Sequence, residues 1–235
     1  MTLVGHLDEL RRRIIIAALA FLVGSVAAFY FAPQILHFLK TPAGTNLGKL
    51  KFLKPAEGFT TYMNISMAAG LILASPVILY EIWAFVVPAL SDRARRYTPL
   101  FILATLFCFL SGCAFAYFVL LPPALKFLLF FAQDEMEYIP TAGEYISFTM
   151  MIILYSGLVF LLPILTFILT KFGIVTAKLL TSKWRYITIL IFIAAALITP
   201  TPDIFNMLLM AAPMLLLYIV SIIVAAAAKP RSNFS

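Results

Sequence analysis

Residues 11–32 read RRRIIIAALAFLVGSVAAFYFA, three arginines followed by 19 residues without a charge. A helix of about 20 apolar residues crosses the hydrocarbon core of a bilayer. The rest of the chain has the same character. Of its 235 residues 63% are apolar and 11% are charged, whereas soluble domains are about a quarter charged. So few charges could not cover the surface of a soluble protein, and the lipid bilayer is therefore the expected solvent.

Further apolar runs predict an all-α integral membrane protein. We expect one polytopic membrane domain over residues 1–235, with six transmembrane helices at residues 14–32, 59–84, 97–122, 145–170, 186–199 and 204–228. Prolines in these runs are expected to kink the helices into a concave bundle. The last two helices are expected to be short. The core of the fifth run is only 13 residues, roughly 20 Å of helix, so it is either re-entrant or thins the membrane around it.

The distribution of positive charge predicts the orientation. With both termini inside, 12 of the 17 lysines and arginines fall on the inner side, as the positive-inside rule requires. A cleaved signal peptide is the competing interpretation of the N-terminus. The apolar run after Arg13 is too long for the hydrophobic region of such a peptide, so we expect an uncleaved first helix.

The inventory of reactive side chains argues against an enzyme. Both histidines lie outside the apolar runs, and no group of His, Cys, Asp and Glu has the spacing of metal ligands. Cys108 and Cys113 are five residues apart, so a helix holds them on different faces and too far apart to form a disulfide. We therefore expect no catalytic residue, metal or cofactor, and no nucleic-acid partner.

Ion or small-solute transport is the alternative function. Such carriers place ionisable groups within the membrane, and here the spans are almost free of them: Glu81 lies near the inner end of the second span and Asp203 at the outer mouth of the sixth. We interpret Glu81 as an interfacial carboxylate that reaches water, and Asp203 as the N-cap of the last helix. A secondary transporter is therefore the less favoured hypothesis.

The charged segment before the first span has two interpretations. Asp8 and Arg12, and Glu9 and Arg13, are spaced four residues apart, the order that stabilises a helix surface. The segment is then either a solvated first turn that sets topology, or a site that presents the Glu9 carboxylate at the inner interface.

Several ordered motifs resemble one known family. They are His6-Leu7-x-Glu9-Leu10-Arg11-x-Arg13, then Pro55 and Phe59, then the run from Ala74 to Phe85 followed by Pro88-Ala89-Leu90, and finally Thr201-Pro202-Asp203, Pro213 and Leu217-Tyr218. Together they are similar to TatC, the receptor subunit of the twin-arginine protein translocase. The resemblance covers essentially the whole chain.

The resemblance implies a function in protein transport. A member of this family would bind signal peptides that carry two consecutive arginines on folded cargo. With small single-span partner subunits like TatA and TatB, it would support transport driven by the proton-motive force. It would lie in the cell inner membrane as a multi-pass protein and form an oligomer in the complex.

The resemblance also implies a set of site residues. Glu9, Arg11 and Phe85 would belong to the signal-peptide site on the inner face, while Pro55 and Asp203 would shape the outer side. Guanidinium groups prefer planar carboxylate partners, which fits a role for Glu9.

The chain departs from the family at three acidic positions. Ala94 stands where family members carry a glutamate of the signal-peptide site, and we expect Asp92, two residues away, to supply that charge. Leu161 and Ile219 stand where two further family acids are usual, so the membrane interior is more apolar than in typical members.

Overall fold

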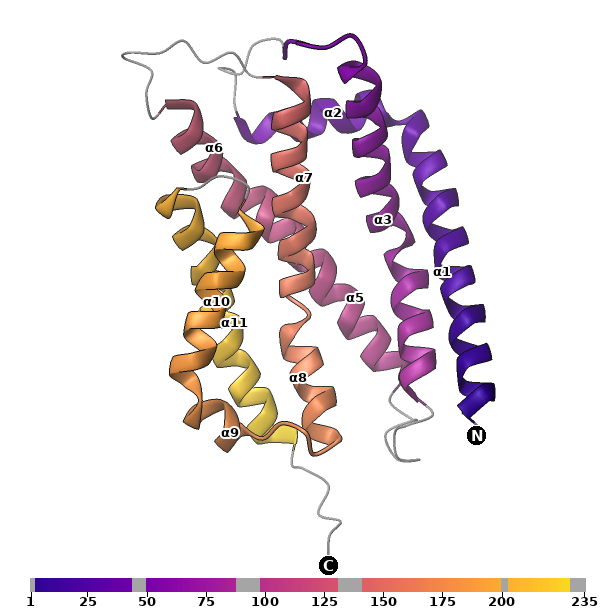
Figure 1. Cartoon of the computed structure of the whole chain (residues 1–235), viewed down its shortest axis with the longest axis vertical. Coiled ribbons are helices and arrows are strands. Elements are labelled where there is room, and N and C mark those ends of the chain that lie inside the picture. The colour runs from indigo at the N-terminus through magenta and orange to yellow at the C-terminus, as the bar shows by residue number, and fades with distance from the viewer. Residues whose placement is uncertain (1–2, 44–49, 88–97, 131–140, 200–202, 229–235) are drawn as a thin grey trace, which may run out of the picture. The chain divides into compact units, whose positions relative to one another are not determined.

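The computed structural model describes residues 3–43, 50–87, 98–130, 141–199 and 203–228. These residues are almost entirely helical (Figure 1). The helices are α1 (Leu3–Tyr30), α2 (Ala32–Lys40), α3 (Glu57–Val86), α5 (Thr98–Phe115), α6 (Leu121–Phe130), α7 (Ala142–Val159), α8 (Leu162–Lys171), α9 (Ala177–Ser182), α10 (Trp184–Ile198) and α11 (Ile204–Ala228). The predicted all-α fold class is confirmed, and a helix overlaps each of the six predicted ranges.

Within the described residues, five helical stretches are long and apolar enough to cross a membrane. The helix over residues 184–198 is shorter, with 15 residues, or about 22 Å against about 30 Å of hydrocarbon. The last helix has 25 residues, so the expectation that both final helices are short is wrong for α11. Its apolar run continues to Ala228 without a charged residue, which allows the full length.

Two of the long helices are irregular near prolines. The stretch from α5 to α6 contains a π-helical turn at residues 116–120, directly before Pro122 and Pro123. The stretch from α7 to α8 is interrupted at residues 160–161, directly before Leu162 and Pro163. Proline has no backbone N–H, and its ring collides with the carbonyl four residues earlier, so a regular α-helix cannot continue unchanged through these positions.

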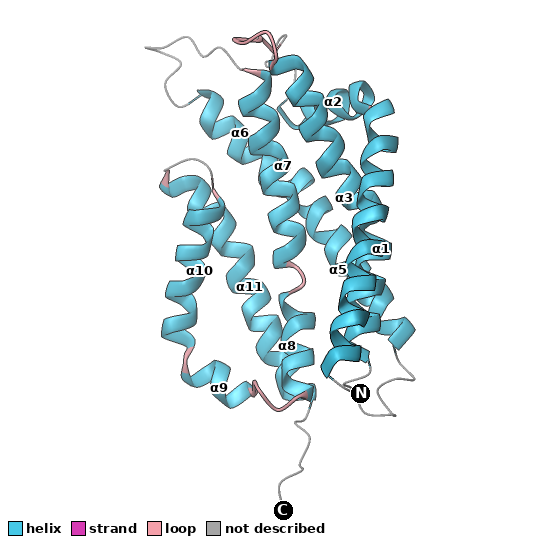
Figure 2. Ribbon diagram, turned by 45° about the vertical axis from the view of Figure 1, so that its right-hand side comes forward, coloured by secondary structure: helices cyan, strands magenta, loops and turns pink. Residues whose placement is uncertain are grey.

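The described residues form two compact units, which we describe separately. The first unit comprises residues 1–110 with 139–150, and the second comprises residues 111–138 with 151–235. In the first unit, α1 and α3 lie side by side and antiparallel (Figures 1 and 2). A Cβ atom on Gly24 would lie 2.8 Å from the carbonyl oxygen of Gly70, and one on Gly70 would lie 2.5 Å from the backbone nitrogen of Ser25. The two backbones therefore touch because both positions lack a side chain.

The Glu57 carboxylate, in the first turn of α3, links the turn before α3 to the start of α7. Its Oε2 accepts hydrogen bonds from the backbone N–H groups of Leu53 (2.8 Å) and Lys54 (3.3 Å). Its Oε1 accepts one from the N–H of Gly143 in the first turn of α7, at 2.9 Å. A carboxylate stabilises the unpaired N–H groups at a helix N-terminus. The start of α3 is thereby held against the start of α7.

The short helix α2 was not predicted from the sequence. It follows α1 directly and places Leu39 in a buried position, and the Leu39 carbonyl accepts a hydrogen bond from the hydroxyl of Tyr145 at 2.8 Å. A second link is the bond from the N–H of Ala142 to the carbonyl of Lys51, at 3.1 Å. The segment between the first two spans is therefore attached to α7 at several points.

In the second unit, α11 packs against α8, α9 and α10. The Tyr218 hydroxyl donates to the carbonyl of Leu180 in α9 at 2.8 Å, and the Lys171 Nζ donates to the carbonyl of Ala228 at 2.6 Å. At the start of α11, the Asp203 Oδ1 accepts from the backbone N–H of Asn206 at 2.6 Å. This last contact confirms the predicted N-cap.

Candidate functional site

The candidate site lies where the N-terminal turns of α1 meet the C-terminal turns of α3. The charged residues of α1 continue the helix of the first span, as the four-residue spacing of Glu9 and Arg13 predicts. Because α1 and α3 are antiparallel and in close contact, the first turns of one helix face the last turns of the other. Side chains that are about 70 residues apart in the sequence are thereby brought together.

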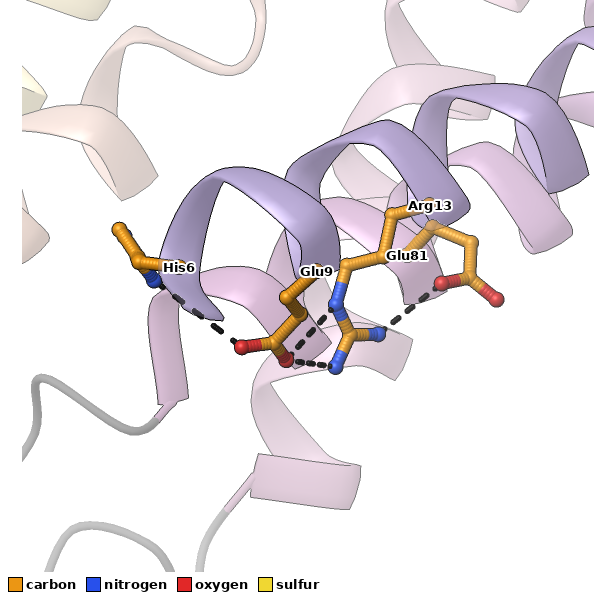
Figure 3. Close-up of polar contacts among 4 residues, drawn as sticks. All are labelled: His6, Glu9, Arg13 and Glu81. Atoms are coloured by element: carbon orange, nitrogen blue, oxygen red, sulfur yellow. Dashed lines mark hydrogen bonds and ion pairs between the residues drawn. The ribbon is translucent and has the colours of Figure 1, made fainter. Parts of the chain in front are cut away.

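Arg13 is bound between two carboxylates (Figure 3). Its Nε and Nη2 donate to Oε1 of Glu9 at 3.1 and 2.5 Å, and its Nη1 donates to Oε2 of Glu81 at 3.0 Å. The exposed fractions of the side chains are 22% for Arg13 and Glu9 and 11% for Glu81. One guanidinium thus serves two partly buried carboxylates, and the three groups together carry one net negative charge.

An aromatic contact lies next to this ion-pair cluster. The ring of His6 stacks on the ring of Phe85, with centroids 4.4 Å apart and an angle of 16° between the planes. The Nδ1 atom of His6 is also 4.0 Å from Oε2 of Glu9. The Glu9 carboxylate is therefore bordered by the ring of His6, which in turn stacks on Phe85 of α3.

The position of Glu81 differs from the sequence-based interpretation. We expected a carboxylate that reaches water, but Glu81 is buried and bound to Arg13. Two residues further along α3, the buried Trp83 donates from Nε1 to the Thr105 hydroxyl of α5 at 2.8 Å. A buried carboxylate requires a cationic or hydrogen-bonding partner, and the contact between α1 and α3 provides Arg13.

The structure brings together some of the predicted site residues and not others. Glu9 and Phe85 both belong to the cluster, while Arg11 is exposed on the same turns of α1 and takes no part in it. Asp92 lies outside the described residues. Pro55 is exposed in the turn before α3, and Asp203 caps α11 in the second unit.

Sequence reasoning missed His6, Arg13 and Glu81 as members of one cluster. For Glu81 a signal was present, because an ionisable residue within an apolar span marks a functional position by default. For Arg13 the four-residue spacing predicted the contact to Glu9 within the helix, but it could not predict the contact to Glu81, which is 68 positions away.

Comparison with known families assigns the chain. The family described as Sec-independent protein translocase protein (TatC) matches residues 5–213. The chain belongs to the TatC family. It is thus an integral membrane protein and a member of a protein-translocase family, and the resemblance inferred from the motifs is confirmed.

Curated TatC proteins from distant organisms are similar to this TatC-family chain over nearly its full length. The protein of Carboxydothermus hydrogenoformans is 40% identical over 98% of this chain and 95% of its own. The protein of Aquifex aeolicus is 41% identical over 94% of this chain and 93% of its own. Both are named as Sec-independent protein translocase proteins, a name that describes transport.

A solved structure agrees with the fold described above. The crystal structure titled as the twin arginine translocase receptor TatC matches this TatC-family chain with a TM-score of 0.85 and 40% identity. It covers 95% of this chain, and this chain covers 99% of it. A match at this level of identity supports both the helical fold described for this chain and its membership of the family.

Proposed function

We propose that this chain is the receptor subunit of a twin-arginine translocase and binds twin-arginine signal peptides at the inner membrane surface. The proposal rests on one observation above all: the carboxylates of Glu9 and Glu81 converge on a single guanidinium, that of Arg13. The same pair of carboxylates offers acceptors to the guanidinium groups of a peptide.

The chemistry of the site suits arginine better than lysine. A guanidinium is planar, carries five N–H donors and bonds carboxylates through two of them at once, whereas an ammonium is a compact point charge. The ring of His6, which lies beside Glu9 and stacks on Phe85, extends the site with an aromatic surface on which a guanidinium can stack. In this proposal Glu81, and not Asp92, supplies the second carboxylate that is missing at Ala94.

The wider function follows from the family. In our proposal, small single-span subunits of the TatA and TatB kind join this receptor, and the proton-motive force drives folded cargo across the cell inner membrane. The names of the relatives, which describe a Sec-independent translocase and a twin-arginine receptor, support this role.

The test is photocrosslinking of a twin-arginine signal peptide to membranes that contain this protein, with a twin-lysine peptide as the control. We expect arginine-dependent crosslinks near Glu9 and Phe85. Glu9→Gln and Glu81→Gln should each weaken binding about tenfold or more, because each removes a charge-assisted hydrogen bond.

Two further variants show which carboxylates the peptide requires. Glu144→Gln removes an exposed carboxylate from the first turn of α7 and should leave crosslinking unchanged. Asp92→Asn tests the sequence-based hypothesis directly. Equal crosslinking of the two peptides would contradict a receptor function, and uptake of a solute by vesicles that contain only this protein would support a secondary transporter instead.

A further inference from the structure

We propose that Arg13 is an internal occupant of the signal-peptide site, which a bound peptide must displace. This inference rests on the function proposed above and concerns how the same site discriminates between ligands. The guanidinium of Arg13 forms with Glu9 and Glu81 the contacts that an arginine of the peptide would form (Figure 3).

The burial of the carboxylates explains why the free site holds a cation. Glu81 retains only 11% exposure of its side chain and Glu9 retains 22%. Two carboxylates that bond the same guanidinium are close enough to repel each other, and each is costly to bury without a partner. The Arg13 guanidinium reduces the repulsion between the carboxylates and gives each of them a partner, so it stabilises the free receptor.

The tether gives Arg13 an advantage over any ligand in solution. A group held on the same chain competes at an effective concentration in the millimolar range or above. A peptide with one arginine only exchanges one guanidinium for another and gains little. A peptide with two adjacent arginines gives each carboxylate a guanidinium of its own. The two carboxylates and the two guanidinium groups then carry no net charge together.

Arg13 has a route out of the cluster. Its side chain is 22% exposed and is held at its tip by the three hydrogen bonds described above. Its neighbours Arg11 and Arg12 are exposed on the same turns of α1. A rotation of the long arginine side chain toward that surface would free both carboxylates without moving either helix. Competition by Arg13 lowers the affinity for every peptide by the same factor, so the site is occupied only by ligands that bind strongly, such as a peptide with two consecutive arginines.

The test compares two peptides on two variants of the full-length protein in membranes. One peptide carries the twin arginines, and the other carries one arginine and one lysine. We expect Arg13→Gln to raise the affinity for both peptides about tenfold, because either peptide must displace Arg13 from the carboxylates. Arg12→Gln removes the same charge one residue away, from an exposed position, and should leave both affinities close to those of the wild-type protein.

The outcomes separate this inference from the proposed function. If the wild-type protein binds neither peptide, the proposed function fails. If the wild-type protein prefers the twin-arginine peptide and Arg13→Gln binds the two peptides no more tightly than Arg12→Gln does, the receptor function stands and internal competition is wrong. Loss of all binding in a folded Arg13→Gln protein would likewise show that Arg13 holds the site together and does not compete.

A conservative pair covers the case in which Arg13→Gln does not fold. Arg13→Lys keeps the positive charge but loses the planar group that contacts both carboxylates, so it should compete less well. We expect Arg13→Lys to bind the twin-arginine peptide more tightly than Arg12→Lys does. Equal affinities of these two variants would overturn the proposal.

Discussion

At the scale of single residues, Lys171 closes the end of the last helix. The final carbonyl groups of a helix have no partner within it, and the Lys171 Nζ donates to the carbonyl of Ala228 at 2.6 Å. A cation at this end also interacts favourably with the helix dipole. One side chain at the end of α8 thus stabilises the last turn of α11.

We expect Lys171→Met to destabilise the protein by about 1 kcal/mol, the net contribution of one hydrogen bond. The amide groups in the last turn of α11 should also exchange their hydrogens faster, as mass spectrometry can measure. Lys178→Met removes an exposed lysine of α9 and is the matched control. Equal exchange in the two variants would show that the bond does not hold this helix end.

Residue roles were predictable where the partner is close in the sequence. Asp203 was expected to cap α11, and its partner Asn206 is three residues away. Glu9 and Arg13 were paired by their spacing within one helix. The role of Glu81 depends on which turn of α1 faces α3, and no local pattern specifies that, so its interaction with Arg13 could not be predicted.

At the scale of helices, the contact at Gly24 and Gly70 sets the relation between α1 and α3. Gly70 lies near the middle of α3 and Gly24 lies toward the end of α1, whereas the residues of the candidate site lie toward the start of α1 and the end of α3. A change in the distance between the helices at this crossing would therefore also change the distance between Arg13 and Glu81.

We expect Gly70→Ala to destabilise the protein by roughly 1–3 kcal/mol, the cost of an overpacked contact, and to weaken peptide crosslinking at the same time. The new Cβ atom would overlap backbone atoms of Ser25, which cannot move without moving α1. Gly58→Ala, in the same helix, is the control, because its Cβ atom would lie 3.4 Å from the ring of Phe52, an ordinary contact. Similar thermal stability of the two variants would contradict the close crossing.

Hydropathy predicted the long helices and the short helix α10 well, but it did not predict α2. The bounds of α11 agree with the predicted residues 204–228, because an uncharged run fills the whole helix. By contrast, α2 has nine residues and mixes apolar side chains with His37 and Lys40. A segment of this length and composition gives no signal of a membrane span, and its helix is stabilised by contacts with α3 and α7.

At the scale of the whole molecule, the topology depends on whether α10 crosses the membrane. It is shorter than the hydrocarbon core is thick, yet it lies between α9 and α11, and α9 contacts the C-terminal half of α11 through Leu180 and Tyr218. If α10 crosses the membrane, the start of α10 and the end of α11 lie on the same side.

Single cysteines test this arrangement in a protein whose Cys108 and Cys113 have been replaced. We expect Ser182→Cys and Ala227→Cys to react with a membrane-impermeant maleimide from the same side of the membrane, and Thr41→Cys to react from the opposite side. Reaction of the first two from opposite sides would mean that only α11 crosses. The concave shape expected from the prolines and the position of both termini inside stay predictions, because they depend on how the whole bundle sits in a bilayer.

The Glu57 carboxylate links residues that the ribosome makes at different times. Its partner Gly143 follows it by 86 residues, and at about 5–20 residues per second the delay is roughly 4 to 17 s. During that interval the start of α3 has no α7 to bind. The contact between the start of α3 and the start of α7 therefore forms only after Gly143 has been synthesised. The nascent chain spends its first seconds in the membrane without this contact.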